Sequence, residues 1–185
     1  ALYCVDLTTG TPIAAIRENT RVVSASTIKV SILCCALQDV MDGKLSLDQP
    51  LAIAPGDFCS DTEVFEPGYR QDGASLWEML YWMIVSSDNT ATNTIISLLG
   101  YDHVNQYCRA IGLTQTSLQR KMLDFQAIAE GRNNYTSPAD LYRVFSRLYH
   151  GEILNKPLRE VAFDFLSRCR STDALQRYIP DAVTV

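Results

Sequence analysis

The stretch SASTIKVSILCCAL, residues 24–37, opens a helix and carries a hydroxyl and an amine three residues apart. Apolar residues recur at helical spacing over residues 32–41, which predicts that the helix continues to that point. Positions i and i+3 share one face of a helix, so the amine of Lys29 can reach the hydroxyl of Ser26. The sequence therefore predicts a helix that presents a serine and a lysine together at its N-terminal end.

This serine and lysine have a chemical use, although their spacing alone has low specificity. A serine hydroxyl is a weak nucleophile until a base takes its proton. A lysine can be that base when burial or neighbouring cations lower its pKa. The free N–H groups of a helix N-terminus also suit a developing oxyanion. Roughly one S-x-x-K match is expected by chance in a chain of this length, so a capping serine followed by a solvated lysine is the plain alternative.

A second polar motif, Ser87-Asp88-Asn89, lies 61 residues after Ser26, at a break between two expected helices. Such a triplet is expected on the order of once in thirty chains of this size at average residue usage. Taken alone it also fits a helix cap, because all three residue types cap helices well. The two motifs in this order, each at a helix end, are far more specific than either one.

The remaining sequence predicts a β-hairpin followed only by helices. Strands at residues 1–7 and 11–17 flank the turn signal Thr8-Thr9-Gly10. Apolar periodicity and capping residues predict the later elements. These are helices near residues 75–84, 90–99, 102–111, 137–148 and 156–169, and a long functional loop with short helical turns at 113–134. We expect one compact domain over residues 1–185, without repeats or an internal boundary.

Composition excludes several functions. The net charge of −5 argues against nucleic acid or an anionic membrane as partner, and no apolar run approaches the ~20 residues of a membrane span. The six cysteines form no C-x-x-C pair and no histidine lies at metal-ligand spacing, so we expect neither a metal nor another cofactor. Free thiols are favoured over a single disulfide.

These features together resemble the serine β-lactamases, class A-like, and the penicillin-binding proteins. S-x-x-K and S-D-N are motifs of that superfamily. Four stretches are similar to it, namely the hairpin at 1–20, the helix at 24–37, the second motif with its helix at 84–100, and residues 133–154 after the omega loop. The resemblance implies an α/β fold of the β-lactamase/transpeptidase type, with a helical lobe and the N-terminal hairpin of an antiparallel sheet.

The resemblance also implies roles for the motif residues. Ser26 would be the acylated nucleophile, with its backbone N–H as one oxyanion donor, and Lys29 would activate it. Ser87 would pass a proton to the departing ring nitrogen, and Asn89 would orient the substrate and the lysine. Asp88 would stabilise the loop. The implied partner is a small-molecule β-lactam or peptidoglycan-like substrate, and we expect an extracellular or cell-envelope location.

One departure from the family is the missing K-T-G or K-S-G motif. The lysines are Lys29, Lys44, Lys121 and Lys156, and none precedes Thr-Gly or Ser-Gly. In the family this motif lies on a strand after the last helix, and the present sequence closes at residues 182–185, about where that strand begins. We therefore expect a domain truncated before the K-T-G strand, completed by a missing C-terminal segment or by another chain.

A second departure is the omega loop, which lacks the glutamate pattern that activates the deacylating water in class A enzymes. Residues 120–126 read RKMLDFQ. Asp124 is the nearest candidate for a deacylation base, and the alternative is a loop carboxylate paired with Arg120 or Lys121. Without a base the acyl-enzyme would persist.

Four functions remain open from the sequence. The first is hydrolysis of a β-lactam or related amide through a Ser26 acyl-enzyme. The second is a D-Ala-D-Ala peptidase or another serine amidase or esterase. The third is a penicillin-sensing module that is acylated without turnover, and the fourth is an inactive, incomplete fragment.

Overall fold

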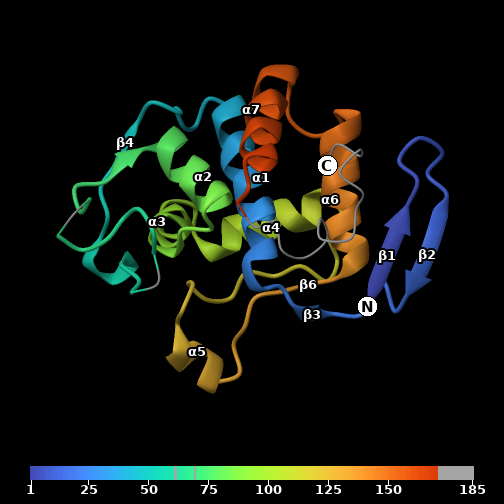
Figure 1. The fold of residues 1–185 in the computed structure, drawn as a ribbon, viewed down its shortest axis with the longest axis horizontal. Coiled ribbons are helices and arrows are strands. Elements are labelled where there is room, and N and C mark those ends of the chain that lie inside the picture. Colours follow the sequence, from blue (N-terminus) through green and yellow to red (C-terminus); the bar gives the residue numbers. More distant parts are fainter. Residues whose placement is uncertain (61, 69, 171–185) are drawn as a thin grey trace.

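The computed structural model describes residues 1–60, 62–68 and 70–170. Figure 1 shows the hairpin standing beside a lobe of helices. The elements, in chain order, are β1 (Leu2–Val5), β2 (Pro12–Ile16), β3 (Val22–Val23), η1 (Ala25–Thr27), α1 (Ile28–Met41), β4 (Pro50–Leu51), η2 (Pro55–Asp57), β5 (Ala74–Ser75), α2 (Leu76–Val85), α3 (Asn89–Leu99), α4 (Tyr101–Ala110), α5 (Phe125–Ala129), β6 (Tyr135–Thr136), α6 (Pro138–His150) and α7 (Lys156–Ser167).

Helix α1 is the centre of the fold and runs through the middle of the molecule (Figure 1). It packs against α2, α3, α4 and α7, and its residues from Ile28 to Leu37 are all buried. A helix that is buried on all sides needs apolar or small residues all round, which explains the run Ile32-Leu33-Cys34-Cys35-Ala36-Leu37. Because α1 is held from several directions, its first turn is a rigid platform for side chains.

The predicted helix caps are confirmed. Ser75 accepts a hydrogen bond from the N–H of Glu78 at the start of α2, and Ser137 accepts one from Asp140 at the start of α6. A side-chain oxygen in this position satisfies one of the backbone donors that the first helical turn leaves without a partner. Local capping chemistry therefore fixes where α2 and α6 begin.

Helices α2 and α7 meet through an aromatic cluster. The rings of Trp77 and Tyr81 stack with centroids 5.2 Å apart, and both meet the ring of Phe165 edge-on. Offset-stacked and edge-on pairs are the favoured arrangements of aromatic rings. This packing places α7 alongside the helix that ends just before the S-D-N motif.

The strands form three antiparallel two-stranded sheets, in which β1 pairs with β2, β3 with β6 and β4 with β5. The predicted hairpin is confirmed, with Leu2 opposite Ile16, and it lies beside α6 (Figure 1). We predicted from the sequence that all strands lie at the start of the chain, and this prediction was wrong for β4, β5 and β6. Strands of two residues carry no alternating pattern, so periodicity cannot reveal them.

The structure agrees with the expected fold class, a helical lobe with an N-terminal hairpin. All six cysteines are free thiols, as predicted. Among the described residues, no helix combines the length and apolar character that a bilayer span requires. The expected truncation before a K-T-G strand concerns residues 182–185, which lie outside the described residues.

Candidate active site

The serine of the first motif sits on a short turn between strand β3 and helix α1. Strand β3 pairs with β6, and the N–H of Ser24 continues that ladder by donating to the carbonyl of Asn134 at 2.9 Å. Ala25, the first residue of η1, takes a positive φ of 45°, and the chain then continues into α1. The turn leaves Ser26 exposed at the entrance of α1.

Lys29 is buried one turn further along, with 2% of its surface exposed. Its ammonium donates to the Ser87 carbonyl at 2.6 Å, to Ser87 Oγ at 2.8 Å and to Asn89 Oδ1 at 2.9 Å. An ammonium group has three protons to donate, and all three of these acceptors are neutral oxygens. The second motif therefore provides the polar surroundings that allow a lysine to be buried at the first turn of α1.

Ser87 joins the two motifs. Its hydroxyl accepts from Lys29 and donates to Ser26 Oγ at 3.0 Å, so the polar connection from the lysine to the exposed serine passes through Ser87. Its backbone has a φ of 59°, in the left-handed region that non-glycine residues usually avoid. This conformation turns both the carbonyl and the hydroxyl of Ser87 toward Lys29.

Asp88 is buried and holds the surrounding backbone. One carboxylate oxygen accepts from the N–H of Ala91 at 2.8 Å and caps α3. The other accepts from the N–H groups of Val64 and Phe65 and from the hydroxyl of Thr62. The loop-stabilising position expected for Asp88 is what the structure shows.

Ser26 lies where two hollows meet. One is polar, with a volume of about 190 Å³, and the other is largely apolar, with a volume of about 380 Å³. The polar hollow is lined by Ser26, Thr62, Glu63, Ser86, Ser87, Asp88 and Asn89. The apolar hollow is lined by Ser26, Thr27, Lys29, Val30, Met83, Ile84, Ser87, Leu166 and Cys169. A compound with an amide and an apolar substituent could therefore place its carbonyl at Ser26 and its substituent along α1 and α2.

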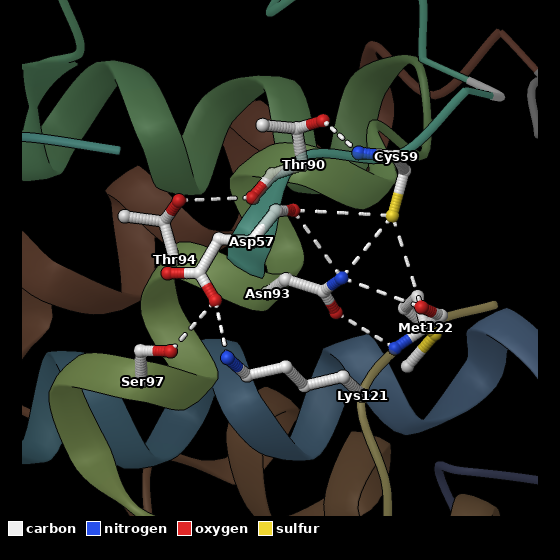
Figure 2. Close-up of polar contacts among 8 residues, drawn as sticks. All are labelled: Asp57, Cys59, Thr90, Asn93, Thr94, Ser97, Lys121 and Met122. Carbon is white, nitrogen blue, oxygen red and sulfur yellow. Dashed lines mark hydrogen bonds and ion pairs between the residues drawn. The ribbon is translucent and has the colours of Figure 1, made fainter. Parts of the chain in front are cut away.

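Side-chain hydrogen bonds and an ion pair connect the loop at residues 113–134 to the helical lobe (Figure 2). The amide of Asn93, on α3, accepts from the N–H of Met122 at 2.7 Å and donates to its carbonyl at 3.3 Å. Lys121 forms an ion pair with Asp57, which is buried and also accepts from Ser97 Oγ at 2.8 Å. The loop is thus bound at two consecutive residues, Lys121 by Asp57 of η2 and Met122 by Asn93 of α3.

Asp124 lies apart from the other predicted site residues. Its carboxylate caps α5 by accepting from the N–H of Ala127 at 2.9 Å. It lines a third hollow, of about 400 Å³, together with Cys59, Asn93 and Phe125, and it is not among the residues that line the two hollows at Ser26. The structure brings together Ser26, Lys29, Ser87 and Asn89, but not Asp124.

The alternative expected for Asp124, a pairing with Arg120 or Lys121, is not observed. Lys121 binds Asp57, and the Arg120 guanidinium donates to Asn133 Oδ1. Burial lowers the pKa of Arg120, and the charge of Asp124 opposes this effect. Asp124 therefore acts on Arg120 at longer range while its own oxygen caps a short helix.

The sequence patterns did not point to the residues that hold the loop, which are Asp57, Asn93 and Asn134. Asn134 is buried and accepts from the N–H groups of Gln119 and Arg120. One signal was available for Asn93, because the expected helix at residues 90–99 carries several polar residues beside its apolar ones. Buried polar side chains require partners, and here the partner is the backbone of a distant loop.

The chain is similar in sequence to known β-lactamases. The model of the β-lactamase enzyme family matches residues 1–185. β-Lactamase FAR-1 of Nocardia farcinica is 30% identical over 171 residues, which cover 89% of this chain and 53% of that protein. The chain thus spans about half the length of this relative.

Solved structures of penicillin-binding proteins and class A β-lactamases have a similar fold. A variant of PBP-A, determined as an acyl-enzyme complex with penicillin G, has a TM-score of 0.84 and 28% identity, with 92% of this chain and 62% of that chain covered. An ancestral class A β-lactamase has a TM-score of 0.87 and 28% identity, with 97% and 69% covered. By its sequence and its fold, this chain belongs to the β-lactamase enzyme family.

Proposed function

We propose that this chain carries the acylation machinery of a serine hydrolase that opens a β-lactam or related amide through a Ser26 acyl-enzyme. The observation that carries the proposal is the hydrogen-bonded series from Lys29 Nζ through Ser87 Oγ to Ser26 Oγ, at 2.8 and 3.0 Å. A nucleophile within hydrogen-bond reach of a base that is itself oriented by a third group is the arrangement that covalent catalysis requires. The orienting group is Asn89.

Acylation can be written with these residues alone. When Lys29 is a neutral amine, both hydrogen bonds of the series reverse, so that Ser26 Oγ donates to Ser87 Oγ and Ser87 Oγ donates to Lys29 Nζ. The Ser26 proton then moves to Ser87 Oγ while the Ser87 proton moves to Lys29 Nζ. The Ser26 oxygen then attacks the amide carbonyl carbon, and the oxyanion receives a hydrogen bond from the Ser26 backbone N–H. When the carbon–nitrogen bond breaks, Ser87 gives its proton to the departing nitrogen and takes one back from Lys29. The Ser26 proton thus ends on the leaving group.

Slow deacylation is a second candidate, in which the chain remains acylated as a penicillin-binding module. The observation that favours it is the position of Asp124, whose carboxylate caps α5 and does not line the hollows at Ser26. The solved relative PBP-A is known as an acyl-enzyme with penicillin G. A peptidoglycan-like peptide is the alternative acyl donor for the same residues, and such substrates imply an extracellular or cell-envelope location.

Intact-mass measurement after exposure to penicillin G tests the proposal. We expect one adduct on the chain, or on a C-terminally extended version of it, and none on Ser26→Ala; Ser146→Ala, on α6, is the matched control and should retain the adduct. Rapid turnover of a chromogenic cephalosporin would identify a β-lactamase, and a stable adduct without turnover a penicillin-binding module. Release of D-alanine from a D-Ala-D-Ala peptide would identify a peptidase. Labelling that survives Ser26→Ala, or no adduct on either version, contradicts the proposal.

A further inference from the structure

A second cluster of reactive side chains lies further along α1, on the side that packs against α4. The Sγ of Cys35, a carboxylate oxygen of Asp39 and a ring nitrogen of His103 all lie within 4.8 Å of one another. Cys35 and Asp39 are one helical turn apart and share a face of α1, while His103 comes from α4. The three donors converge from two packed helices of the rigid core.

The Asp39 carboxylate is held in a fixed orientation. Its side chain is 7% exposed, and its two oxygens have different partners. Oδ1 accepts from Lys44 Nζ at 3.0 Å, while Oδ2 lies 2.6 Å from His103 Nε2. Lys44 therefore fixes one oxygen and leaves the other directed at the imidazole. Orientation of a ligand by a neighbour of this kind is a recurrent feature of metal sites.

The donor types select one class of metal ion. A thiolate, an imidazole nitrogen and a carboxylate oxygen form a mixed set that suits Zn²⁺ and similar transition ions. Mg²⁺ and Ca²⁺ require oxygen ligands. We propose that Cys35, Asp39 and His103 bind a Zn²⁺-type ion, with a water molecule as the fourth ligand.

Only a small adjustment is needed for an ion to enter. Zn²⁺ bonds to nitrogen and oxygen are about 2.0–2.2 Å long and bonds to sulfur about 2.3 Å, so tetrahedral coordination places neighbouring donors more than ~3 Å apart. The distance between His103 Nε2 and Asp39 Oδ2 must therefore widen from 2.6 Å. The His103 side chain is 40% exposed, which gives it room to turn and gives the ion a path from solvent.

The buried thiol must give up a proton when the ion binds. Burial, followed by the charge of Asp39, raises the pKa of Cys35, so the metal-free site holds a thiol, and coordination as thiolate releases its proton to solvent. Our expectation from sequence that no metal is bound rested on ligand spacing within one segment. It could not detect donors that are 64 residues apart on two helices.

Cobalt absorption tests the site, because a thiolate bound to Co²⁺ gives a charge-transfer band in the near ultraviolet. The protein for this titration is treated with a chelator and has the exposed Cys4 and Cys169 replaced by serine, so that surface thiols cannot contribute. One equivalent of Co²⁺ should produce the band, and Zn²⁺ should abolish it by displacement. Cys35→Ser should remove it, and His103→Gln should weaken Co²⁺ binding at least roughly tenfold.

His150→Gln is the matched control, since His150 is exposed on α6, and it should leave the Co²⁺ titration unchanged. Persistence of the band in Cys35→Ser overturns the proposal. Should that variant not fold, His103→Gln decides, because an unchanged Co²⁺ affinity in this variant also overturns it. A parent protein that gives neither the band nor a Zn²⁺-dependent rise in Tm overturns the proposal and leaves the cluster as a hydrogen-bonded contact between α1 and α4.

Discussion

Ser87 combines backbone strain with a functional hydroxyl. Its φ of 59° costs about 1 kcal/mol for a residue with a Cβ, while its hydroxyl contacts both Lys29 and Ser26. Strain of this kind persists where the surrounding structure determines the conformation. Here the carbonyl and the hydroxyl of Ser87 both accept hydrogen bonds from the buried lysine, and these two bonds help to hold the strained conformation.

Two substitutions at Ser87 separate strain from chemistry. Ser87→Gly and Ser87→Ala both remove the hydroxyl, but only glycine relieves the positive φ. We expect the glycine variant to have a free energy of unfolding about 1 kcal/mol higher than that of the alanine variant, as measured by urea denaturation. Both variants should acylate much more slowly than the parent chain. Equal stabilities would show that the backbone at this position is not strained.

Four of the site residues could be predicted from the sequence alone. Ser26, Lys29, Ser87 and Asn89 were found because the motif spacing and the order of the motifs are local properties of the chain. The structure places them together, with Ser87 in the middle of the series. The partnership of Asp39 with His103 could not be found, because it depends on how α4 packs against α1.

Among the elements, the loop at residues 113–134 depends on side chains of its neighbours for its position. Lys121 and Met122 are held by Asp57 and Asn93 (Figure 2). The loop contributes only the short α5 as a named element. Its backbone bonds to neighbouring strands at Ser117 and Asn134, so side chains are needed to hold the part around Lys121 and Met122. Side chains on η2 and α3 therefore help to determine the conformation of the loop, together with its own sequence.

Removal of the Lys121 charge tests this dependence. Lys121→Met leaves the buried carboxylate of Asp57 without its cation, and breaking a buried pair costs about 3 kcal/mol. We expect this loss of unfolding free energy, together with faster amide hydrogen exchange across residues 113–134. Lys156→Met is the matched control. Lys156 pairs with Glu160 on the exposed surface, so its change should cost less than ~1 kcal/mol.

Helices were predictable and the small sheets were not, for a physical reason. Caps such as Ser75 and Ser137 act within one turn of their own residue, so a sequence window contains the whole interaction. Strands β3 and β6 are two residues each and exist only because they pair across more than a hundred residues. Pairings of this kind depend on the assembled fold, and no local pattern encodes them.

In the molecule as a whole, the hairpin packs against fewer neighbouring elements than the central helix of the core does. Strands β1 and β2 pair with each other, and β1 packs against α6, where the rings of Tyr3 and Tyr142 meet edge-on at 5.2 Å. Helix α1 is instead packed by four helices. Segments with fewer buried contacts open at lower free energy, so the hairpin should open before the core does.

Hydrogen exchange on Tyr142→Ala tests this difference. Loss of the ring pair should speed exchange of the β1 and β2 amides by up to roughly tenfold, since such pairs contribute about 0.5–1.5 kcal/mol beyond their buried area. Exchange in α1 should change little. Tyr149→Ala, an exposed ring on the same helix, serves as the control and should leave the hairpin unchanged. A matching acceleration in α1 would show that hairpin and core open as one unit.

Because the Ser87 hydroxyl lies between Lys29 and Ser26, proton transfer between them does not depend on water when a bound compound fills the hollows at Ser26. Both links in this path are protein side chains, so an occupant that drives every water molecule out of the hollows leaves the route for the proton intact. Exclusion of water strengthens the electrostatic interactions at a reacting carbonyl. In this arrangement the proton can still move through Ser87 while water is excluded. A path relying on bulk solvent would be cut at the moment the occupant closes over it.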